Sequence, residues 1–512
     1  MNGAESLART LLACGVDTCF ANPGTSEMHF VAALDRVPGI RCVLALFEGV
    51  ATGAADGYAR MAGKPAATLL HCGPGLANGL SNLHNASRGH VPIVNIVGDQ
   101  ATYHAPLDPP LAAETATWAR PISTWLRTAT QPQAVGEFAA EAVRAACTPP
   151  GGIATLILPS DASWSEGGVA QGPLRVPAPA TLANATLDDV ARILRSGEPA
   201  MLFLGGDALR AGPLADAHRI AAATGARLMA ETFCVRMARG RGRFAIDRLP
   251  YNVEPGLATL AGIRHLILVG ADDPVAFFAY PDMPGRFAPP DAKVTTLTRP
   301  GEDSAEALLR LAELLAAPQL APPERRTPPP ATGAITQANV GQTLAALLPE
   351  NAVVVEEGVT FGFGLYAPMA DAAPHDYLRL VGGAIGDGLP LSTGAAIGAP
   401  GRRVIGLQAD GSALYTIQAL WTQARERLDI TTVILSNRRY AILDGELAAV
   451  GAAPGPASRA LFDLGNPDMD WVHIANGFGV EAARAETMEA FADVFAHANS
   501  RPGPFLIELV IP

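Results

Sequence analysis

The stretch Gln408–Ala409–Asp410–Gly411–Ser412 decides how the C-terminal part of this chain folds. The strand-like run Arg403–Leu407 precedes this acidic turn, and the helix-like run Leu414–Arg425 follows it. A second strand-like run, Ile430–Leu435, leads to Asn437. This order predicts a βαβ unit, in which Asp410 and Asn437 lie at the carboxyl ends of neighbouring parallel strands. Open α/β sheets bind their ligands at that edge.

Oxygen ligands at two strand ends suit a hard cation. The carboxylate of Asp410 and the amide oxygen of Asn437 fit Mg²⁺, which proteins hold with few side chains plus phosphate oxygens. The backbone N–H groups of Gly411 and Ser412 open a helix, where an anion is favoured. The turn therefore predicts a site for Mg²⁺ and a diphosphate.

Composition indicates a multidomain globular protein. Of 512 residues, 49% are apolar, which predicts roughly three domains with sizeable cores. The formal net charge is −12 without a basic cluster, so we expect no nucleic-acid partner. We find no membrane-spanning run and no signal-peptide core, so we expect a cytoplasmic protein. The six cysteines form no Cys-x-x-Cys pair, which indicates reduced, buried thiols.

Two stretches rich in proline and glycine, Ser165–Pro179 and Pro318–Gly333, have the composition of linkers. They predict domains at residues 1–165, 180–318 and 334–512. Each segment alternates strand-like and helix-like runs, which predicts three α/β domains with parallel sheets.

The first segment repeats the order of elements around Asp410. It reads as a strand at Ala66–Leu70, a turn at Gly73–Pro74–Gly75, a helix at Leu76–Ala86 and a strand at Val91–Val97. The middle segment has Gly205–Gly206–Asp207 directly after a strand but no Gly-x-Gly-x-x-Gly motif. A tight helix start is the expected structure there, and FAD binding is the alternative.

Glu48 follows the strand-like run Arg41–Phe47 and precedes a helix that contains Ala55–Asp56–Gly57–Tyr58–Ala59–Arg60. A carboxylate at this place stabilises a helix N-terminus. A catalytic carboxylate is the second interpretation, and it gains weight because the chain already predicts a diphosphate site.

Taken together, these motifs resemble the thiamine diphosphate (ThDP)-dependent decarboxylase and acetolactate synthase superfamily. Asp410–Gly411–Ser412 followed by Asn437 is similar to its cofactor signature, with Ala409 in place of the usual first glycine. The Glu48 motif and Gly382–Gly383–Ala384–Ile385–Gly386 match two further elements. The resemblance covers almost the whole chain and is closest to benzoylformate decarboxylase and to acetolactate synthase large-subunit-like proteins. It implies a pyrimidine-binding domain, a Rossmann-like middle domain and a diphosphate-binding domain.

The resemblance also implies roles for individual residues. Glu48 would relay a proton to the pyrimidine ring of the cofactor. Asp410, Asn437 and the backbone carbonyl of Arg439 would bind Mg²⁺. Ile385 would support the two cofactor rings. The remaining cofactor contacts would be made by residues along the diphosphate and the glycine-rich loop: Thr360, Gly383, Gly411, Ser412, Asn437 and Tyr440.

Two residues are candidate substrate contacts by the same resemblance. Thr25, in Asn22–Pro23–Gly24–Thr25–Ser26–Glu27, falls on a serine near the substrate of benzoylformate decarboxylase. The alternative is that Thr25 or Ser26 caps the next helix. His71 falls on a histidine that aids proton transfer, and the alternative is a buried core histidine.

The chain departs from its relatives at some substrate positions. Benzoylformate decarboxylase has a second histidine in its middle domain, but Pro274–Tyr280 contains none. The helix after the cofactor site carries Glu446, where related enzymes often place an apolar or aromatic residue. Glu446 would either bind a polar or cationic substrate or stay solvated.

We therefore expect a ThDP- and Mg²⁺-dependent enzyme that decarboxylates a 2-oxo acid without oxidation. Release of an aldehyde is the main reading, because His71 is present and FAD signals are weak. The alternatives are acetolactate synthase-like carboligation to a second carbonyl and, in a different class, a ThDP-binding subunit without turnover. By resemblance, Glu48 and Asp410 serve one cofactor from two subunits, so we expect a homodimer or a dimer of dimers.

Overall fold

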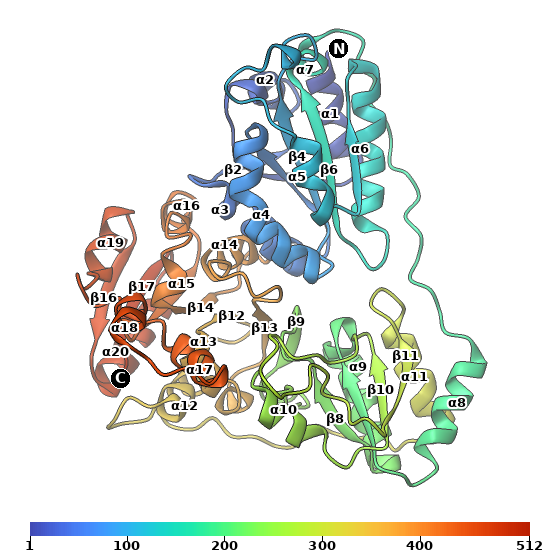
Figure 1. Cartoon of the computed structure of the whole chain (residues 1–512), viewed down its shortest axis with the longest axis vertical. Helices are drawn as coiled ribbons and strands as arrows, with labels where there is room; N and C mark the ends of the chain where they lie inside the picture. Colours follow the sequence, from blue (N-terminus) through green and yellow to red (C-terminus); the bar gives the residue numbers. More distant parts are fainter.

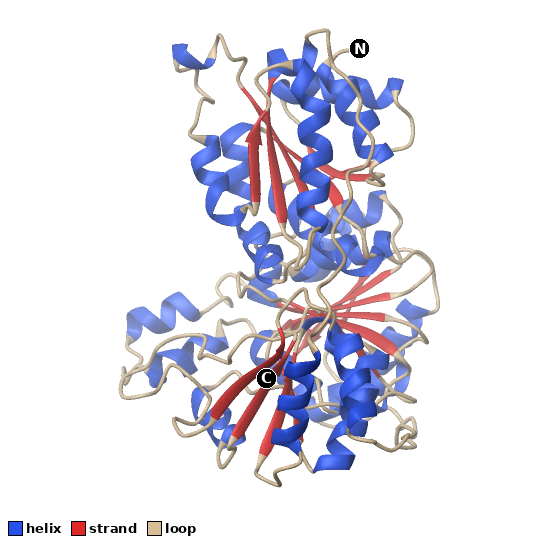
Figure 2. Cartoon of the chain, turned by 90° about the vertical axis from the view of Figure 1, so that its right-hand side faces the viewer, coloured by secondary structure: helices blue, strands red, loops and turns tan.

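The computed structural model describes residues 1–512 as α/β layers on three sheets. Figure 1 shows the N-terminal segment at the top, the middle segment at the lower right and the C-terminal segment at the lower left. Helices cover both faces of the sheets (Figure 2). Every strand pair is parallel except one, so the predicted α/β fold with parallel sheets is confirmed. No helix combines the length and apolarity needed to cross a bilayer.

The first sheet has six strands in the order β2-β1-β3-β4-β6-β5. Its strands are β1 (Thr18–Asn22), β2 (Arg41–Leu44), β3 (Ala66–Leu70), β4 (Ile93–Asp99), β5 (Trp125–Thr128) and β6 (Ile153–Pro159). Its α-helices are α1 (Gly3–Ala13), α2 (Met28–Arg36), α3 (Glu48–Ala62), α4 (Cys72–Arg88), α5 (Thr115–Ala119), α6 (Pro132–Cys147) and α7 (Ser160–Trp164). Short 3₁₀ turns are η1 (Thr25–Glu27), η2 (Ala105–Leu107) and η3 (Arg120–Ile122).

The second sheet has four strands in the order β11-β10-β7-β8. They are β7 (Ala200–Leu204), β8 (Arg227–Ala230), β10 (His265–Val269) and β11 (Lys293–Thr298). The helices around it are α8 (Asn184–Leu194), η4 (Gly206–Leu209), α9 (Ala211–Thr224), α10 (Val253–Leu260) and α11 (Ser304–Leu314).

The third sheet has seven strands in the order β16-β17-β15-β14-β12-β13-β9. They are β9 (Arg236–Arg239), β12 (Val353–Glu357), β13 (His375–Arg379), β14 (Val404–Ala409), β15 (Ile430–Ser436), β16 (Glu481–Ala485) and β17 (Phe505–Val510). Its longer helices are α12 (Gln337–Leu347), α14 (Gly388–Gly398), α16 (Ala419–Arg425), α17 (Ala441–Ala449), α18 (Pro456–Phe462), α19 (Trp471–Gly477) and α20 (Met488–Asn499). Single turns are α13 (Val359–Gly362), η5 (Phe363–Leu365), η6 (Pro368–Asp371) and α15 (Asp410–Ala413).

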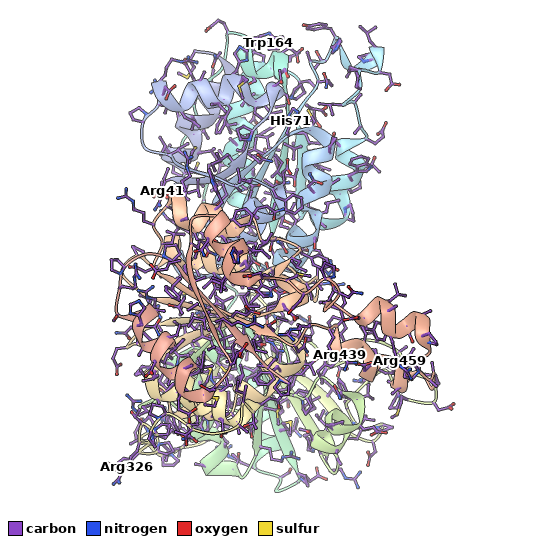
Figure 3. The ribbon with its side chains drawn as sticks, turned by 90° about the vertical axis from the view of Figure 1, so that its left-hand side faces the viewer. Arg41, His71, Trp164, Arg326, Arg439 and Arg459 are labelled. Atoms are coloured by element: carbon purple, nitrogen blue, oxygen red, sulfur yellow. The ribbon has the colours of Figure 1, made fainter.

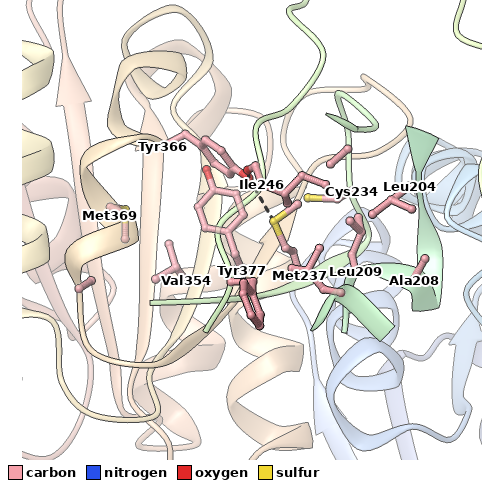
Figure 4. Close-up of a cluster of buried hydrophobic side chains, with 14 of the residues drawn as sticks. Leu204, Ala208, Leu209, Cys234, Met237, Ile246, Val354, Tyr366, Met369 and Tyr377 are labelled. Atoms are coloured by element: carbon pink, nitrogen blue, oxygen red, sulfur yellow. Dashed lines mark hydrogen bonds between the residues drawn. The ribbon is translucent and has the colours of Figure 1, made fainter. Parts of the chain in front are cut away.

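Strand β9 crosses from the middle segment into the third sheet, where it pairs antiparallel with β13. Buried side chains follow the same route. Met237 of β9 packs with Tyr366 and Tyr377, and the Tyr366 hydroxyl donates to the Met237 sulfur at 3.1 Å (Figure 4). The middle and C-terminal segments therefore share one hydrophobic core. The domain limits drawn from the linkers stay a prediction.

Helices α3 and α14 join the first segment to the third through glycine contacts. A Cβ on Gly57 would lie 2.1 Å from the Leu391 carbonyl oxygen, and one on Gly394 would lie 1.8 Å from that of Ala54. Only residues without a side chain allow the two backbones to approach so closely. This contact fixes the position of Glu48, the first residue of α3, relative to the loop before α14.

Two local predictions were wrong. Gly73–Pro74–Gly75 is not a turn, because α4 already begins at Cys72. Proline is tolerated there since the first N–H groups of a helix have no partner inside it. The helix expected over Leu414–Arg425 is interrupted between α15 and α16. Thr416 in that gap donates its hydroxyl to the Gly386 carbonyl at 2.8 Å, a tertiary contact that competes with helix formation.

Candidate active site

Polar side chains gather at the carboxyl ends of two sheets. In the third sheet, β14 and β15 pair in parallel and end at Asp410 and Asn437, as the βαβ prediction requires. In the first sheet, β1 leads to Glu27, β2 leads towards Glu48, and β3 ends next to His71. Figure 3 shows His71 in the upper, N-terminal part of the molecule and Arg439 in the lower part.

The C-terminal group of residues encloses a small pocket of about 60 Å³. Most of the predicted cofactor and metal residues line it: Thr360, Ile385, Asp410, Gly411, Ser412, Asn437, Arg439 and Tyr440. Gly383 does not, although it belongs to the same loop as Ile385. Every lining residue lies between Gly358 and Ile511, so the N-terminal candidates Thr25, Glu48 and His71 stand outside this pocket.

Backbone groups hold the Asp410 carboxylate in place. The N–H of Gly411 donates to its Oδ1 at 2.7 Å, and the N–H of Arg438 donates to its Oδ2 at 2.6 Å. Burial raises the pKa of Asp410 even though these N–H groups favour the charged form. Asn437 is fixed in the same way, because its Oδ1 accepts from the N–H of Arg439 at 3.1 Å.

Two non-glycine residues in left-handed conformations flank the pocket. Val359 has φ +46°, which is unfavourable for a β-branched residue, and Arg438 has φ +59°. Val359 lines the pocket, and Arg438 directs its N–H at Asp410. Strained backbone of this kind persists where the surrounding structure demands it, and it concentrates at ligand sites.

The glycine-rich loop is anchored from both sides. Gly383 (φ +81°) and Gly386 (φ +94°) adopt conformations that favour glycine. Asn85 of α4 accepts from the N–H of Ala384 at 3.1 Å and donates to its carbonyl at 2.8 Å. Buried Glu357 accepts from the N–H groups of Gly386, at 2.6 Å, and Gly388. Asn85 and Glu357 were not among the predicted site residues, although both contact the loop that carries Ile385.

The donor set fits the group that the sequence predicts. A buried carboxylate, an amide oxygen and a backbone carbonyl are hard oxygen ligands of the kind that Mg²⁺ takes. The Arg439 guanidinium is a cation that pairs with Asp444 and cannot bind a metal, so the candidate ligand is the backbone carbonyl. A Cβ on Gly411 would lie 2.4 Å from the Tyr440 ring, so the pocket wall has no space for a side chain at that position.

Glu48 is buried at the start of α3, where Asn78 Nδ2 donates to its Oε2 at 2.9 Å. It lies close to His71, because a Cβ on Gly75 would be 3.1 Å from Glu48 Oε1 and 3.4 Å from the His71 Cβ. The structure thus brings Glu48 and His71 together at the carboxyl ends of the strands of the first sheet. Asn78 was not predicted, although its spacing on α4 places it one turn from Gly75.

His71 is held by its neighbours through Nδ1. This atom lies 2.8 Å from Oε2 of buried Glu27 and 3.2 Å from the Ser26 hydroxyl. Glu27 is itself fixed by the N–H of Gly24 at 2.7 Å and by the Ser26 hydroxyl at 2.5 Å. Because Nδ1 is occupied, Nε2 is the ring nitrogen that remains for another partner.

Ser26, rather than the predicted Thr25, makes the contact with His71. Thr25 is exposed on η1. Neither residue caps α2, because the N-cap of that helix is Glu27 and no side chain bonds there. Glu27 was not among the predicted site residues. The sequence does contain an indication of its role, because Glu27 lies three positions after Gly24, which is the spacing of a capping box.

Glu446 is held by two protein partners rather than left to solvent, and its role as a substrate contact stays a prediction. The hydroxyl of Tyr251 donates to its Oε1 at 3.0 Å and that of Tyr280 donates to its Oε2 at 2.6 Å. Glu446 therefore ties α17 to two loops of the middle segment. Sequence could not reveal this contact, because the three residues come from distant parts of the chain.

The Gly205–Gly206 turn borders a cleft of about 1120 Å³ between the first and middle segments. Its walls include the carboxylates of Asp207, Glu231 and Asp303, and burial raises the pKa of Glu231 to about 8. The 3₁₀ turn η4 starts at Gly206, so this is a helix start, as expected. FAD binding stays an untested alternative.

Comparison with known proteins defines the class. Residues 1–119 match the N-terminal TPP binding domain of the thiamine pyrophosphate enzymes, and residues 365–509 match their C-terminal TPP binding domain. Thiamine pyrophosphate and ThDP are the same compound. The chain belongs to this ThDP-dependent enzyme family.

Particular relatives span the whole chain. The chain is 52% identical over 515 residues, 100% of this chain and 99% of the relative, to “Putative acetolactate synthase large subunit IlvX” of Mycobacterium tuberculosis. It is 31% identical to benzoylformate decarboxylase of Pseudomonas aeruginosa, over 97% of this chain and 96% of that one. A 4-hydroxybenzoylformate decarboxylase structure from Rhodococcus jostii RHA1 superposes with a TM-score of 0.83 at 26% identity, covering 100% of this chain and 99% of the other.

Proposed function

We propose that this protein uses ThDP and Mg²⁺ to decarboxylate a 2-oxo acid and join the remaining acyl group to a second carbonyl, as in acetolactate synthases. The observation that carries this choice is the 52% identity, over essentially both whole chains, to an acetolactate synthase-like relative. Bound ThDP would supply the electron sink that makes loss of carbon dioxide feasible. The residues of this chain bind, orient and move protons around it.

The C-terminal pocket would provide the binding half of this chemistry. Asp410, Asn437 and the Arg439 carbonyl are the proposed Mg²⁺ ligands. The backbone around Gly411 and Ser412, together with Thr360, is the proposed diphosphate contact. Ile385 would support the rings from a loop that Asn85 and Glu357 hold rigidly. Rigid supports matter because a site displaced by about 1 Å can lose roughly 100-fold in rate.

The N-terminal group of residues would handle protons. Glu48 is the proposed relay, kept in one orientation by Asn78. His71 would act at the substrate through Nε2, since Glu27 occupies Nδ1. This fixed histidine supports a second candidate function, in which a proton replaces the lost carboxylate and an aldehyde leaves. The similarity to benzoylformate decarboxylase favours that outcome too.

A complete site would need two copies of the chain. The pocket of Asp410 has no wall from residues 1–357, so Glu48 would come from a partner subunit. Exposed apolar side chains lie beside both the N-terminal group of residues and the C-terminal pocket. They are Leu46 near Glu48, Tyr415 near Gly386, and Leu461 on α18. A second copy of the chain would cover them, which supports a homodimer or a dimer of dimers.

Subunit mixing tests this arrangement. Glu48→Gln and Asp410→Ala chains would each be inactive alone. Unfolded together and refolded, they would recover about a quarter of wild-type activity, because half of the dimers are mixed and each mixed dimer has one intact site. Recovery of nothing, while each variant still assembles, would contradict a site shared between subunits.

Product analysis tests the reaction. Purified protein with Mg²⁺ and ThDP is incubated with a panel of 2-oxo acids, with and without a second carbonyl compound. Carbon dioxide with a 2-hydroxy ketone or 2-hydroxy-2-methyl-3-oxo acid supports the carboligase. Carbon dioxide with an aldehyde moves the assignment to the decarboxylase, and His71→Gln should then lower the aldehyde yield. Bound cofactor without any carbon dioxide would contradict both.

A further inference from the structure

Two cysteines stand opposite each other on neighbouring strands of the first sheet. In the parallel pairing of β1 with β2, Cys19 is the register partner of Cys42. Register partners on parallel strands direct their side chains to the same face. Neighbouring strands lie about 4.7–4.9 Å apart, which is inside the roughly 4.4–6.8 Å that separates the Cα atoms of a disulfide. The two backbones therefore need no large movement to be bridged.

The two thiols also differ in their surroundings. Strand β2 is the edge of its sheet, and Cys42 is exposed on it, whereas Cys19 is fully buried. Figure 3 shows the neighbouring Arg41 at the periphery of the molecule. The neighbouring Cys19 thiol lowers the pKa of Cys42, whereas the Cys42 thiol and burial together raise the pKa of Cys19 well above its usual value. An exposed, more acidic thiol beside a second one has the features of an oxidant-sensitive pair.

We propose that Cys19 and Cys42 are a redox modification site, at which a hydroperoxide converts the two thiols into a reversible disulfide. The exposed Cys42 thiolate would attack one peroxide oxygen, breaking the O–O bond and forming a sulfenic acid. The Cys19 sulfur would then displace the sulfenic oxygen, which leaves as water with the Cys19 proton. With hydrogen peroxide, two thiols lose two electrons and two protons in all, and the peroxide becomes two molecules of water.

The position of this bond connects it to the catalytic segment. Strand β1 continues into the turn with Ser26 and Glu27, which hold His71, and β2 leads towards Glu48. A disulfide at this register would lock the edge strand to its neighbour directly before these residues. No other pair of cysteines has this arrangement, because the remaining four lie on other elements or in loops: Cys14, Cys72, Cys147 and Cys234.

Peptide mapping of the full-length protein tests the proposal. Reduced protein is treated with hydrogen peroxide, the remaining thiols are alkylated, and the tryptic digest is read without reduction. Cys42 lies in the peptide Cys42–Arg60, and Cys19 shares the peptide Thr10–Arg36 with Cys14. The protein used is therefore the Cys14→Ser variant. We expect one linked species of these two peptides, lighter by two hydrogens and cleaved by dithiothreitol.

Two further variants separate the steps, and a third serves as a control. In Cys19→Ser, Cys42 should accumulate sulfenic acid, trapped by dimedone, and then the irreversible sulfinic acid. In Cys42→Ser, Cys19 should stay reduced, and Cys147→Ser should behave like the parent. The proposal is overturned if Cys42 stays reduced, if it is over-oxidised with Cys19 present, or if Cys147 or Cys234 reacts before it.

Discussion

The first and third sheets of this enzyme follow the same architectural rule with different chemistry. Both place functional groups at the carboxyl ends of parallel strands. At the first sheet, side chains contact one another, as His71, Glu27 and Ser26 do. At the third sheet, side chains are held by backbone, as Asp410 is by the N–H groups of Gly411 and Arg438.

This difference suggests that the two sheets have separate tasks, acid–base chemistry at the first and cofactor binding at the third. Side chains that share protons with other side chains can change protonation state, which suits acid–base work. A carboxylate fixed by backbone N–H groups beside strained residues such as Val359 has little freedom, which suits binding. We therefore expect the first sheet to control turnover and the third sheet to control cofactor affinity.

Glu48→Gln should give the largest effect. It keeps the size of the side chain and the contact with Asn78 but removes the proposed proton relay, so turnover should fall by about 10²–10⁴-fold. ThDP binding in the presence of Mg²⁺, measured by calorimetry, should stay within about threefold of wild type. Glu166→Gln, which changes an exposed glutamate in the linker just after the first segment, is the control and should keep full activity. Full activity of Glu48→Gln would contradict the assignment of turnover to the first sheet.

Asp410→Ala should act on binding instead. Loss of this proposed metal ligand should weaken ThDP affinity by about 100-fold or more, since even groups that only support metal ligands are worth roughly 10–100-fold. Asp493→Ala is the control, because Asp493 is an exposed carboxylate on α20 that does not line the pocket. If Asp410→Ala and wild type bind ThDP with equal affinity at saturating Mg²⁺, Asp410 has no role in cofactor binding.

Gly394→Val tests the contact that joins the two sheets. Its Cβ would meet the Ala54 carbonyl oxygen at 1.8 Å, so α3 and α14 must separate. Overpacking of this kind typically costs about 1–3 kcal/mol, so denaturant unfolding should show a loss of that size. Gly212→Ala on α9 has open space around it and should be neutral or stabilising. Unchanged stability of Gly394→Val would mean that the helices do not meet as described.

The pH dependence of stability should carry a signal from Glu357. Burial raises its pKa from 4.5 to about 7, so the folded protein binds this proton more tightly than the unfolded chain. Protonated Glu357 therefore adds on the order of 3 kcal/mol to the free energy of unfolding. This stabilisation is fully present below about pH 4.5 and is lost as the pH rises to about 7. Glu357→Gln should therefore lose less stability than wild type across this window. Parallel curves for the two proteins would contradict the raised pKa.

Sequence predicted the elements whose signals are local. The runs around Asp410 and Asn437 became β14 and β15, and Ala66–Leu70 became β3 without a change of limits. Alternation and β-branching within a few residues suffice for such strands. The helix predicted from Leu414 failed because Thr416 bonds to Gly386, a partner distant in sequence.

Sequence by itself determined the family, the three parallel α/β layers and the oxygen-rich turn at Asp410, because each of these is written in contiguous residues with a fixed period or spacing. The tertiary structure decided which side chains work together. It placed Ser26 rather than Thr25 on His71, bound Glu446 to Tyr251 and Tyr280, and set Cys19 opposite Cys42. These partners are brought together by strand register and helix packing, which depend on the whole core rather than on any one segment.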